Sequence, residues 1–458
     1  MVPRRMALDA EATHQAAGDQ GADRGERLGV DPATGRPLRV CLVNQYLVPD
    51  VASTGYLIYE LAIELAKLGF DVKVYTTMPG YGPKETRVVA PRREVVEGVE
   101  IHRLWATRFS KTSLVGRASN YLTFVASMFL RLLFTSRRDT VYLYTTAPPI
   151  LTFIGAMVSL FRKHRYVHLL YDAFPQVAVW VGTIRGGSAI DRLWHAMNKI
   201  CYGRATRAIV LCQKARSLVH DTYGMRRDRI HVIPNWADGE EFQRREKADS
   251  KFAREHDLLD KFVVMYSGNL GLYYDFETIL GAAERLEGEP FKLVLIGSGG
   301  KREWIREQIE ARKLKNTLLL PYQPRASLND SLSAADASLV SIAEGIEGIS
   351  FPSKLYTSLA VGRTILALSE TDSELRELVE KRGVGRWAAL GDVDGMAEVI
   401  RGLMHEPGEV REQGLRAREL FERGFTREIC SERYARVLRA AHPLVDSDAE
   451  LHLDSIGG

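Results

Sequence analysis

The sequence has few cysteines, and it lacks the patterns that several common classes of protein need. Its four cysteines are scattered and form no Cys-x-x-Cys pair, which fits a reducing compartment where thiols are buried as small hydrophobic groups. It has no zinc-finger spacing and no long Lys/Arg tract, and its net charge is only +4, so no nucleic-acid partner is expected. The eleven histidines do not fall at metal-ligand spacings, so no metal site is expected either.

Other absences exclude particular enzymes. No Gly-x-Gly-x-x-Gly follows the first predicted strand, which argues against a nicotinamide dehydrogenase. There is no Walker lysine motif, and no Gly-x-Ser-x-Gly turn accompanies a plausible triad. The N-terminal residues 1–37 lack an apolar segment of the secretory type, so we interpret them as a disordered tail, and the acidic residues 441–458 as a second loose tail.

What is present is an alternation of strands and helices in a chain of 458 residues, which is too long for one compact core. A buried strand at 39–44, a helix at 56–68 and a strand at 71–77 form one β-α-β unit, and a second unit of this kind begins at 261. We therefore predict an α/β fold of two Rossmann-like domains with parallel sheets and a ligand cleft between them. The predicted division is a first domain at 38–238, a linker at 239–260, a second domain at 261–415 and a C-terminal helix at 416–440.

Two apolar segments interrupt this alternation. Residues 121–134 and 150–161 are strongly apolar helices followed by basic residues, but neither reaches the ~20 apolar residues that a bilayer span needs. They can form an amphipathic hairpin that lies in the plane of an anionic membrane surface. Alternatively, they are core helices of the first domain with solvated charges at their ends.

Three turns stand where a phosphate group can bind. Segments 267–271 and 296–300 are glycine-bearing turns after predicted strands, where backbone N–H groups are available to an anion, although an ordinary turn explains each equally well. Segment 344–356 places Ser353 and Lys354 in the first turn of a helix, directly after Pro352. A helix N-terminus that carries a lysine is a good anion site, so Lys354 is the sharpest candidate.

At these residues the chain resembles the family 4 retaining glycosyltransferases, in the bacterial branch that assembles exopolysaccharides, O-antigens and colanic acid-like polymers. The resemblance covers roughly residues 38–439. The segments that carry it are Ser-Thr-Gly at 53–55, Tyr-Asp-Ala-Phe-Pro at 171–175, Ile-Pro-Asn-Trp-Ala-Asp at 233–238, Tyr-Ser-Gly-Asn-Leu-Gly at 266–271, Leu-Pro-Tyr-Gln-Pro at 320–324, and Phe-Pro-Ser-Lys-Leu-Tyr at 351–356 with the run that follows to Arg363.

The resemblance implies a GT-B fold, with the nucleotide-sugar donor bound mainly by the second domain and the acceptor by the first. It also implies a metal-independent enzyme, with no cofactor besides the donor, in which protein groups stabilise the leaving diphosphate. The residues it suggests for catalysis are Lys354, Asp172 and Glu347. Those it suggests for donor binding are Gly55, Gly268, Asn269, Gly271, Tyr274, Gly297, Tyr322, Ser353 and Thr357. Asp172 would orient a hydroxyl, although a core or capping carboxylate explains it equally well.

The chain departs from the family pattern at several of these positions. Asn269 and Tyr274 stand where many relatives carry phosphate-binding Arg and Lys, which leaves more of that role to Lys354. Thr357 replaces the glutamate that commonly binds ribose, and Glu347 lies near the other glutamate but is displaced from it. A histidine that is common in the first domain is replaced near 145–148.

The function implied is transfer of a hexose or N-acetylhexosamine from a nucleotide-sugar, by family habit a UDP-sugar, to a lipid-linked saccharide. The expected location is cytoplasmic, peripheral at the inner face of the cell membrane. Two alternatives remain open: a nucleotide-sugar epimerase of the same fold, which needs no acceptor, and a non-catalytic partner subunit of another transferase.

Overall fold

The computed structural model describes residues 28–445 except 51, 81–88 and 110–113. The predicted tails at 1–27 and 446–458 lie outside these residues. Residues 28–37, which we had counted with the N-terminal tail, are attached to the first domain: the backbone N–H of Gly29 donates to the carbonyl of Leu68 at 3.0 Å, and Val30 forms a bridge with Pro37.

Within the described chain, the first sheet has the strand order β3-β4-β2-β1-β5-β6-β7-β8, and only the β3–β4 pair is antiparallel. Its strands are β1 (Arg39–Val43), β2 (Asp71–Thr77), β3 (Arg93–Val96), β4 (Val99–Leu104), β5 (Thr140–Thr145), β6 (Arg165–Leu170), β7 (Arg207–Val210) and β8 (Ile230–Val232). Alternate side chains of each strand enter different cores. Val40 and Leu42 of β1, for example, pack on one face while Cys41 and Val43 pack on the other.

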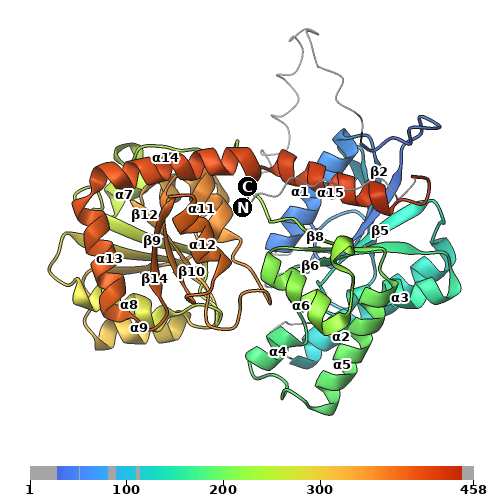
Figure 1. Cartoon of the computed structure of the whole chain (residues 1–458), viewed down its shortest axis with the longest axis horizontal. Coiled ribbons are helices and arrows are strands. Elements are labelled where there is room, and N and C mark those ends of the chain that lie inside the picture. Colours follow the sequence, from blue (N-terminus) through green and yellow to red (C-terminus); the bar gives the residue numbers. More distant parts are fainter. Residues whose placement is uncertain (1–27, 51, 81–88, 110–113, 446–458) are drawn as a thin grey trace, which may run out of the picture.

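Helices cover both faces of this sheet (Figure 1). One face packs against α1 (Ser53–Lys67) and α15 (Arg427–Ala441), and the other against α2 (Leu114–Thr135), α3 (Leu151–Phe161), α5 (Ala189–Arg204) and α6 (Gln213–Tyr223). The short helix α4 (Gln176–Trp180) follows β6, and the 3-10 turn η2 (Arg227–Arg229) precedes β8.

The second sheet is parallel throughout the described residues, in the order β11-β10-β9-β12-β13-β14. Its strands are β9 (Phe262–Asn269), β10 (Phe291–Ser298), β11 (Thr317–Leu320), β12 (Ala337–Ser341), β13 (Thr364–Ser369) and β14 (Gly385–Ala389). The helices around it are η3 (Lys247–Asp249), α7 (Lys251–Glu255), α8 (Phe276–Arg285), α9 (Arg302–Ala311), α10 (Arg325–Ser333), α11 (Lys354–Ala360), α12 (Glu374–Lys381), α13 (Val393–His405) and α14 (Pro407–Gly424). The α/β fold of two Rossmann-like domains is thus as predicted.

The structure differs from two of the expected boundaries. The stretch 239–260, expected as a linker, contains α7, and its Phe242, Phe252 and Leu258 are buried in the core of the second domain. In place of one C-terminal helix over 416–440 there are two, α14 and α15. They separate near Thr426, whose hydroxyl caps α15 by accepting from the backbone N–H of Ile429.

The chain crosses between the domains twice, and the two crossings lie side by side. Ala237 leaves the first domain and pairs with Thr426, where the chain returns, and its backbone N–H donates to the Phe425 carbonyl at 3.3 Å. After the return, α15 lies across the first domain (Figure 1). Arg427 at its start forms ion pairs with Glu64 of α1 at 3.2 Å and with Asp238 at 2.9 Å.

Candidate active site

The candidate site lies at the carboxyl edge of the second sheet, where β9 and β10 end side by side. Gly268 and Gly297 are partners in this pair, and each has φ near +145°. A Cβ on Gly297 would lie only 1.8 Å from the Gly268 carbonyl oxygen, so no larger residue fits there. The two glycines therefore leave a stretch of backbone that a ligand can approach closely.

The other residues of the first predicted turn are placed beside these glycines. The side chain of Asn269 is exposed, and a Cβ on Gly271 would lie 2.7 Å from its amide nitrogen. Asn269 therefore folds back over Gly271 and partly covers the turn.

Lys354 begins α11 and extends over this edge. Its ammonium lies 3.8 Å from the ring centre of Tyr266 and 3.7 Å from that of Tyr274, and it donates a hydrogen bond to the Tyr266 hydroxyl. Its side chain also passes Gly268, where a Cβ would meet Cε at 3.3 Å. Burial lowers the pKa of Lys354 well below its usual range, because no carboxylate offsets the loss of solvation.

The remaining donor-side candidates lie around this lysine. Tyr322 follows β11, is 56% exposed, and donates from its hydroxyl to the Ser298 carbonyl at 3.3 Å. Ser353 is exposed just before α11, and Thr357 lies one turn along it, donating to the Lys354 carbonyl at 3.0 Å. The structure thus brings Lys354, Tyr274 and the Gly268–Gly297 pair together, whereas the Thr357 hydroxyl is occupied within its own helix.

Asp172 is the residue that the first domain contributes to this site. It follows β6, and its backbone N–H donates to the Thr146 hydroxyl at 3.2 Å, while its carboxylate accepts a hydrogen bond from Ser350 of the second domain. Burial raises the pKa of Asp172, and its charge adds to the burial that raises the pKa of Tyr273 to about 12. The carboxyl group therefore lies at the domain junction, close to Tyr273 and to Tyr274, one of the two tyrosines that flank Lys354.

Gly55 and Glu347 have different surroundings. Gly55 is in the first turn of α1, where a Cβ would lie 3.1 Å from the Tyr46 carbonyl oxygen, so the preceding loop packs closely on the helix. The Glu347 side chain is only 2% exposed and forms an ion pair with Lys214 of the first domain at 3.1 Å. It also accepts from the Ser373 hydroxyl at 2.9 Å and from the backbone N–H of Leu375 at 3.1 Å. The oxygens of Glu347 are thus committed to the start of α12 and to Lys214, and do not face Lys354 as a reacting group would.

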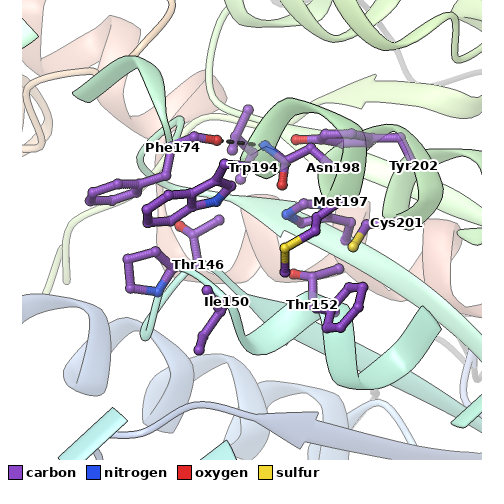
Figure 2. A pocket seen from close by; sticks show the side chains of 13 residues that line it. Thr146, Ile150, Thr152, Phe174, Trp194, Met197, Asn198, Cys201 and Tyr202 are labelled. Carbon is purple, nitrogen blue, oxygen red and sulfur yellow. Dashed lines mark hydrogen bonds between the residues drawn. The ribbon is translucent and has the colours of Figure 1, made fainter. Parts of the chain in front are cut away.

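A small pocket of about 10 Å³ lies between β6, the start of α3 and α5 (Figure 2). Phe174 and Trp194 stack in its wall with ring centres 5.8 Å apart, and Asn198 donates to the Phe174 carbonyl at 2.6 Å. His168 and the Thr152 hydroxyl also line it, and neither has a hydrogen-bond partner among the described residues. Burial lowers the pKa of His168 to about 3, so its ring is neutral.

Comparison with known proteins accounts for this geometry. Residues 54–236 match the family described as "Glycosyl transferase 4-like domain", and residues 248–420 match "Glycosyl transferases group 1". The two matches meet at the domain junction and between them contain every candidate residue. The chain belongs to the family 4 glycosyltransferases of the GT-B fold.

The glycosyltransferase is similar to two curated proteins. It is 24% identical over 403 residues to the probable glycosyltransferase WbjE of Pseudomonas aeruginosa, covering 88% of this chain and 98% of the relative. It is 33% identical over 159 residues to WcaI of Escherichia coli K12, whose name assigns it to colanic acid biosynthesis; that match covers 34% of this chain and 39% of the relative.

Two solved structures share the fold of the glycosyltransferase. Sucrose-phosphate synthase from Thermosynechococcus elongatus has a TM-score of 0.71 at 17% identity, covering 88% of this chain and 98% of that one. HepE from Anabaena in complex with UDP-glucose has a TM-score of 0.64 at 15% identity, covering 87% of this chain and 99% of that one. The predictions of family, fold and enzyme class are therefore confirmed, and the chain is a glycosyltransferase of the GT-B fold.

Sequence reasoning missed three residues that shape the site of the glycosyltransferase. Tyr266 reads as an ordinary core residue of β9, and only its hydroxyl contact with Lys354 reveals it. Ser350 and Lys214 meet Asp172 and Glu347 from the opposite domain, so no pattern along the chain signals them. Within the described residues, no group of three or more His, Cys, Asp or Glu side chains is arranged to hold a metal ion. Metal-independent transfer remains a prediction.

Proposed function

We propose that this glycosyltransferase moves a hexose or N-acetylhexosamine from a UDP-sugar to a lipid-linked saccharide at the inner face of the cell membrane, with retention of anomeric configuration. The observation that carries the donor half is the position of Lys354, a cation beside the glycine-formed ends of β9 and β10. A diphosphate there would pair with the ammonium and accept from backbone N–H groups of the turn 268–271 other than that of Leu270, which donates to the Ser298 carbonyl at 2.9 Å. UDP is the proposed carrier because HepE, which has the same fold, was solved with UDP-glucose.

The reaction we propose is a front-face displacement. The bond from the anomeric carbon to the diphosphate oxygen breaks, and the bond from the acceptor oxygen forms on the same face of the sugar. The hydroxyl proton passes to the departing diphosphate oxygen, which lies on that face. Lys354 and the Ser353 backbone would stabilise the charge that develops on the diphosphate. Asp172, held by Thr146 and Ser350, would orient the attacking hydroxyl.

The acceptor half is proposed for the first domain. It rests on Asp172, which follows β6 of the first domain and accepts a hydrogen bond from Ser350 of the second. The relative WcaI, whose name assigns it to colanic acid biosynthesis, supports a saccharide as the acceptor. The pocket lined by His168 and Thr152 has only about 10 Å³ of open space, which admits a water molecule but not a sugar ring.

The lipid part of the acceptor is proposed from α2. No helix of the described chain is long and apolar enough to cross a bilayer. The 22 residues of α2 include no acidic residue, and one side of the helix is exposed at Leu122 (58%), Leu130 (56%) and Phe134 (76%) while the other side is core. The segment is a core helix on one side, and its exposed apolar side supports the proposal of peripheral binding at a membrane interface.

The test is donor-dependent transfer with UDP-sugars and a bacterial lipid extract, comparing the wild type with Lys354→Ala. Lys292→Ala is a matched control, because Lys292 lies at the opposite end of β10, where its ammonium donates to the Lys315 carbonyl at 2.8 Å. We expect UDP release that requires the extract and collapses in Lys354→Ala but not in the control. UDP release without any acceptor would point to an epimerase or hydrolase. Failure of every donor in a panel that includes GDP-sugars would point to a partner subunit.

A further inference from the structure

A second concave surface of the first domain lies where α2, α3 and α5 end, away from the donor site. It is a groove of about 810 Å³. Its lining, called here the basic groove, consists of Ser136, Arg138, Ser159, Leu160, Phe161, Arg162, Lys163, His164, Arg165, Gly203, Arg204 and Thr206. No residue assigned to donor or acceptor above lies in it.

Five cations and no carboxylate line the basic groove: Arg138, Arg162, Lys163, Arg165 and Arg204. Within the described chain, no ion pair involves any of these five side chains, so no carboxylate offsets their charge. His164 adds no charge, because burial lowers its pKa to about 3 and both ring nitrogens are hydrogen-bonded, to Ser136 and Tyr144. The groove therefore carries a local surplus of positive charge.

The negative ends of the three helices do not neutralise this positive charge. Each helix C-terminus is equivalent to roughly −0.5 elementary charge, so three of them supply about −1.5 against five formal positive charges. The helix ends do fix the geometry: Arg204 donates to the Ser159 hydroxyl at 2.7 Å and to its carbonyl at 3.1 Å, and Arg162 donates to the Leu133 carbonyl at 3.0 Å. A guanidinium has five N–H donors, so these contacts leave donors for an anion.

The rim of the groove is apolar, which distinguishes between kinds of anion. Leu160 and Phe161 are 55% and 65% exposed, and Phe134 at the end of α2 is 76% exposed. A free phosphate would gain nothing from these side chains. A phospholipid presents a phosphate and, directly below it, acyl chains that can cover apolar side chains.

We propose that the basic groove binds the headgroup phosphate of an anionic phospholipid, so that this end of α2 is fixed at the membrane surface. This inference rests on the membrane part of the proposed function. It adds a discrete phosphate site to the general apolar contact made by α2.

The test is co-sedimentation of the full chain with vesicles of phosphatidylcholine alone and of phosphatidylcholine with 30% phosphatidylglycerol, about the anionic content at which surface cations respond strongly. The variant Arg162→Gln/Lys163→Gln removes two charges of the groove. Each cation near an anionic surface contributes about a factor of five, so we expect roughly 25-fold weaker binding to the anionic vesicles and little change with phosphatidylcholine. The control Lys313→Gln/Lys315→Gln removes two exposed cations from the second domain and should bind like the wild type.

The variant Leu122→Ser/Leu130→Ser removes two exposed apolar side chains of α2 and separates this inference from the proposed function. It should lose binding to both kinds of vesicle. UDP binding, measured by calorimetry on every variant, reports that each is folded. The inference is overturned if the wild type binds both vesicles equally, or if the groove variant keeps its preference for phosphatidylglycerol. It is also overturned if 10 mM phosphate raises the melting temperature of the wild type but not of the groove variant while phosphatidylglycerol confers no preference, since the groove would then hold a soluble anion.

Discussion

At the scale of single residues, the donor site depends on a lysine whose charge is costly to bury. Lys354 lies between two tyrosine rings, with no carboxylate among its contacts in the described structure. A bound diphosphate would supply the missing negative charge. The state of this one side chain should therefore be coupled to nucleotide binding.

This coupling predicts a pH dependence for UDP affinity. In the free protein, burial lowers the pKa of Lys354, and in the complex the diphosphate raises it again. Affinity should therefore be constant while the free lysine is protonated, and should fall as the pH rises through its lowered pKa toward the pKa in the complex. Calorimetry from pH 7 upward, where a phosphate's second ionisation near pH 6 is complete, measures this effect.

Lys354→Met is the matched variant, because it fills the same space without the charge. We expect its UDP affinity at pH 7 to be about 10- to 100-fold weaker, as for loss of one charged hydrogen bond at roughly 1.5–3 kcal/mol. Its pH profile should lack the fall seen in the wild type. An equal fall in both proteins would assign the titration to UDP or to another group.

Gly297 gives a second prediction at this scale. In Gly297→Ala the new Cβ would meet the Gly268 carbonyl oxygen, and φ lies in a region that favours glycine, so the two strand ends must separate. We expect a loss of unfolding free energy of about 4 kcal/mol or more, together with loss of UDP binding. Gly203→Ala in α5 meets no atom within 4 Å and should leave stability unchanged or raise it by ~0.5–1 kcal/mol. Urea unfolding measures the free energy of unfolding of both variants. A similar loss in the two would show that Gly297 is not needed for the close approach of the strand ends.

At the scale of elements, the last helix of the chain completes the first domain. Cys430, Tyr434 and Leu438 of α15 are buried in the same core as β1 and α1, and Tyr434 packs edge-to-face on Trp236. The core of the first domain therefore includes residues from the C-terminal helix α15.

Tyr434→Ala should therefore destabilise the first domain, by ~3–5 kcal/mol as for other large-to-small changes of buried aromatic residues. Glu432→Ala, two residues earlier on the exposed side of α15, should stay within ~0.5 kcal/mol of the wild type. Hydrogen exchange locates the effect: amides of β1 and β5 should exchange faster in Tyr434→Ala, while those of β9 and β10 should not. Faster exchange confined to the second domain would refute this assignment of α15.

At the scale of the whole molecule, the second domain caps a helix of the first. Glu374 at the start of α12 accepts from the backbone N–H of Gln213 at 2.9 Å and from that of Lys214, at the start of α6. Glu347 caps α12 and pairs with the Lys214 side chain. Carboxylates at helix N-termini are stabilising, so these contacts favour the closed arrangement of the two domains.

Lys214→Met should weaken this closure, because it leaves the buried carboxylate of Glu347 without its cation. We expect a larger radius of gyration by small-angle X-ray scattering in the absence of UDP, and a higher KM for the donor. The control Lys251→Met alters an exposed lysine of α7 and should scatter like the wild type. An unchanged radius in Lys214→Met would show that other contacts hold the domains together.

The sequence by itself determined the alternation of strands and helices, because buried parallel strands and amphipathic helices follow local periodicity. Strand β2 begins and ends where predicted, and the strand predicted at 39–44 matches β1 to within one residue at one end. It also identified the glycine turns and Lys354, since these signals lie within a few adjacent residues.

Only the tertiary structure decided which distant residues meet. It placed α15 in the first domain and assigned 239–260 to the second. It showed that Glu347 pairs with Lys214 and that Tyr266 contacts Lys354. It also showed which side of α2 remains exposed and gathered the five cations of the basic groove. The physical reason is that such contacts join segments far apart in the chain, so their energies leave no periodic pattern within any one segment.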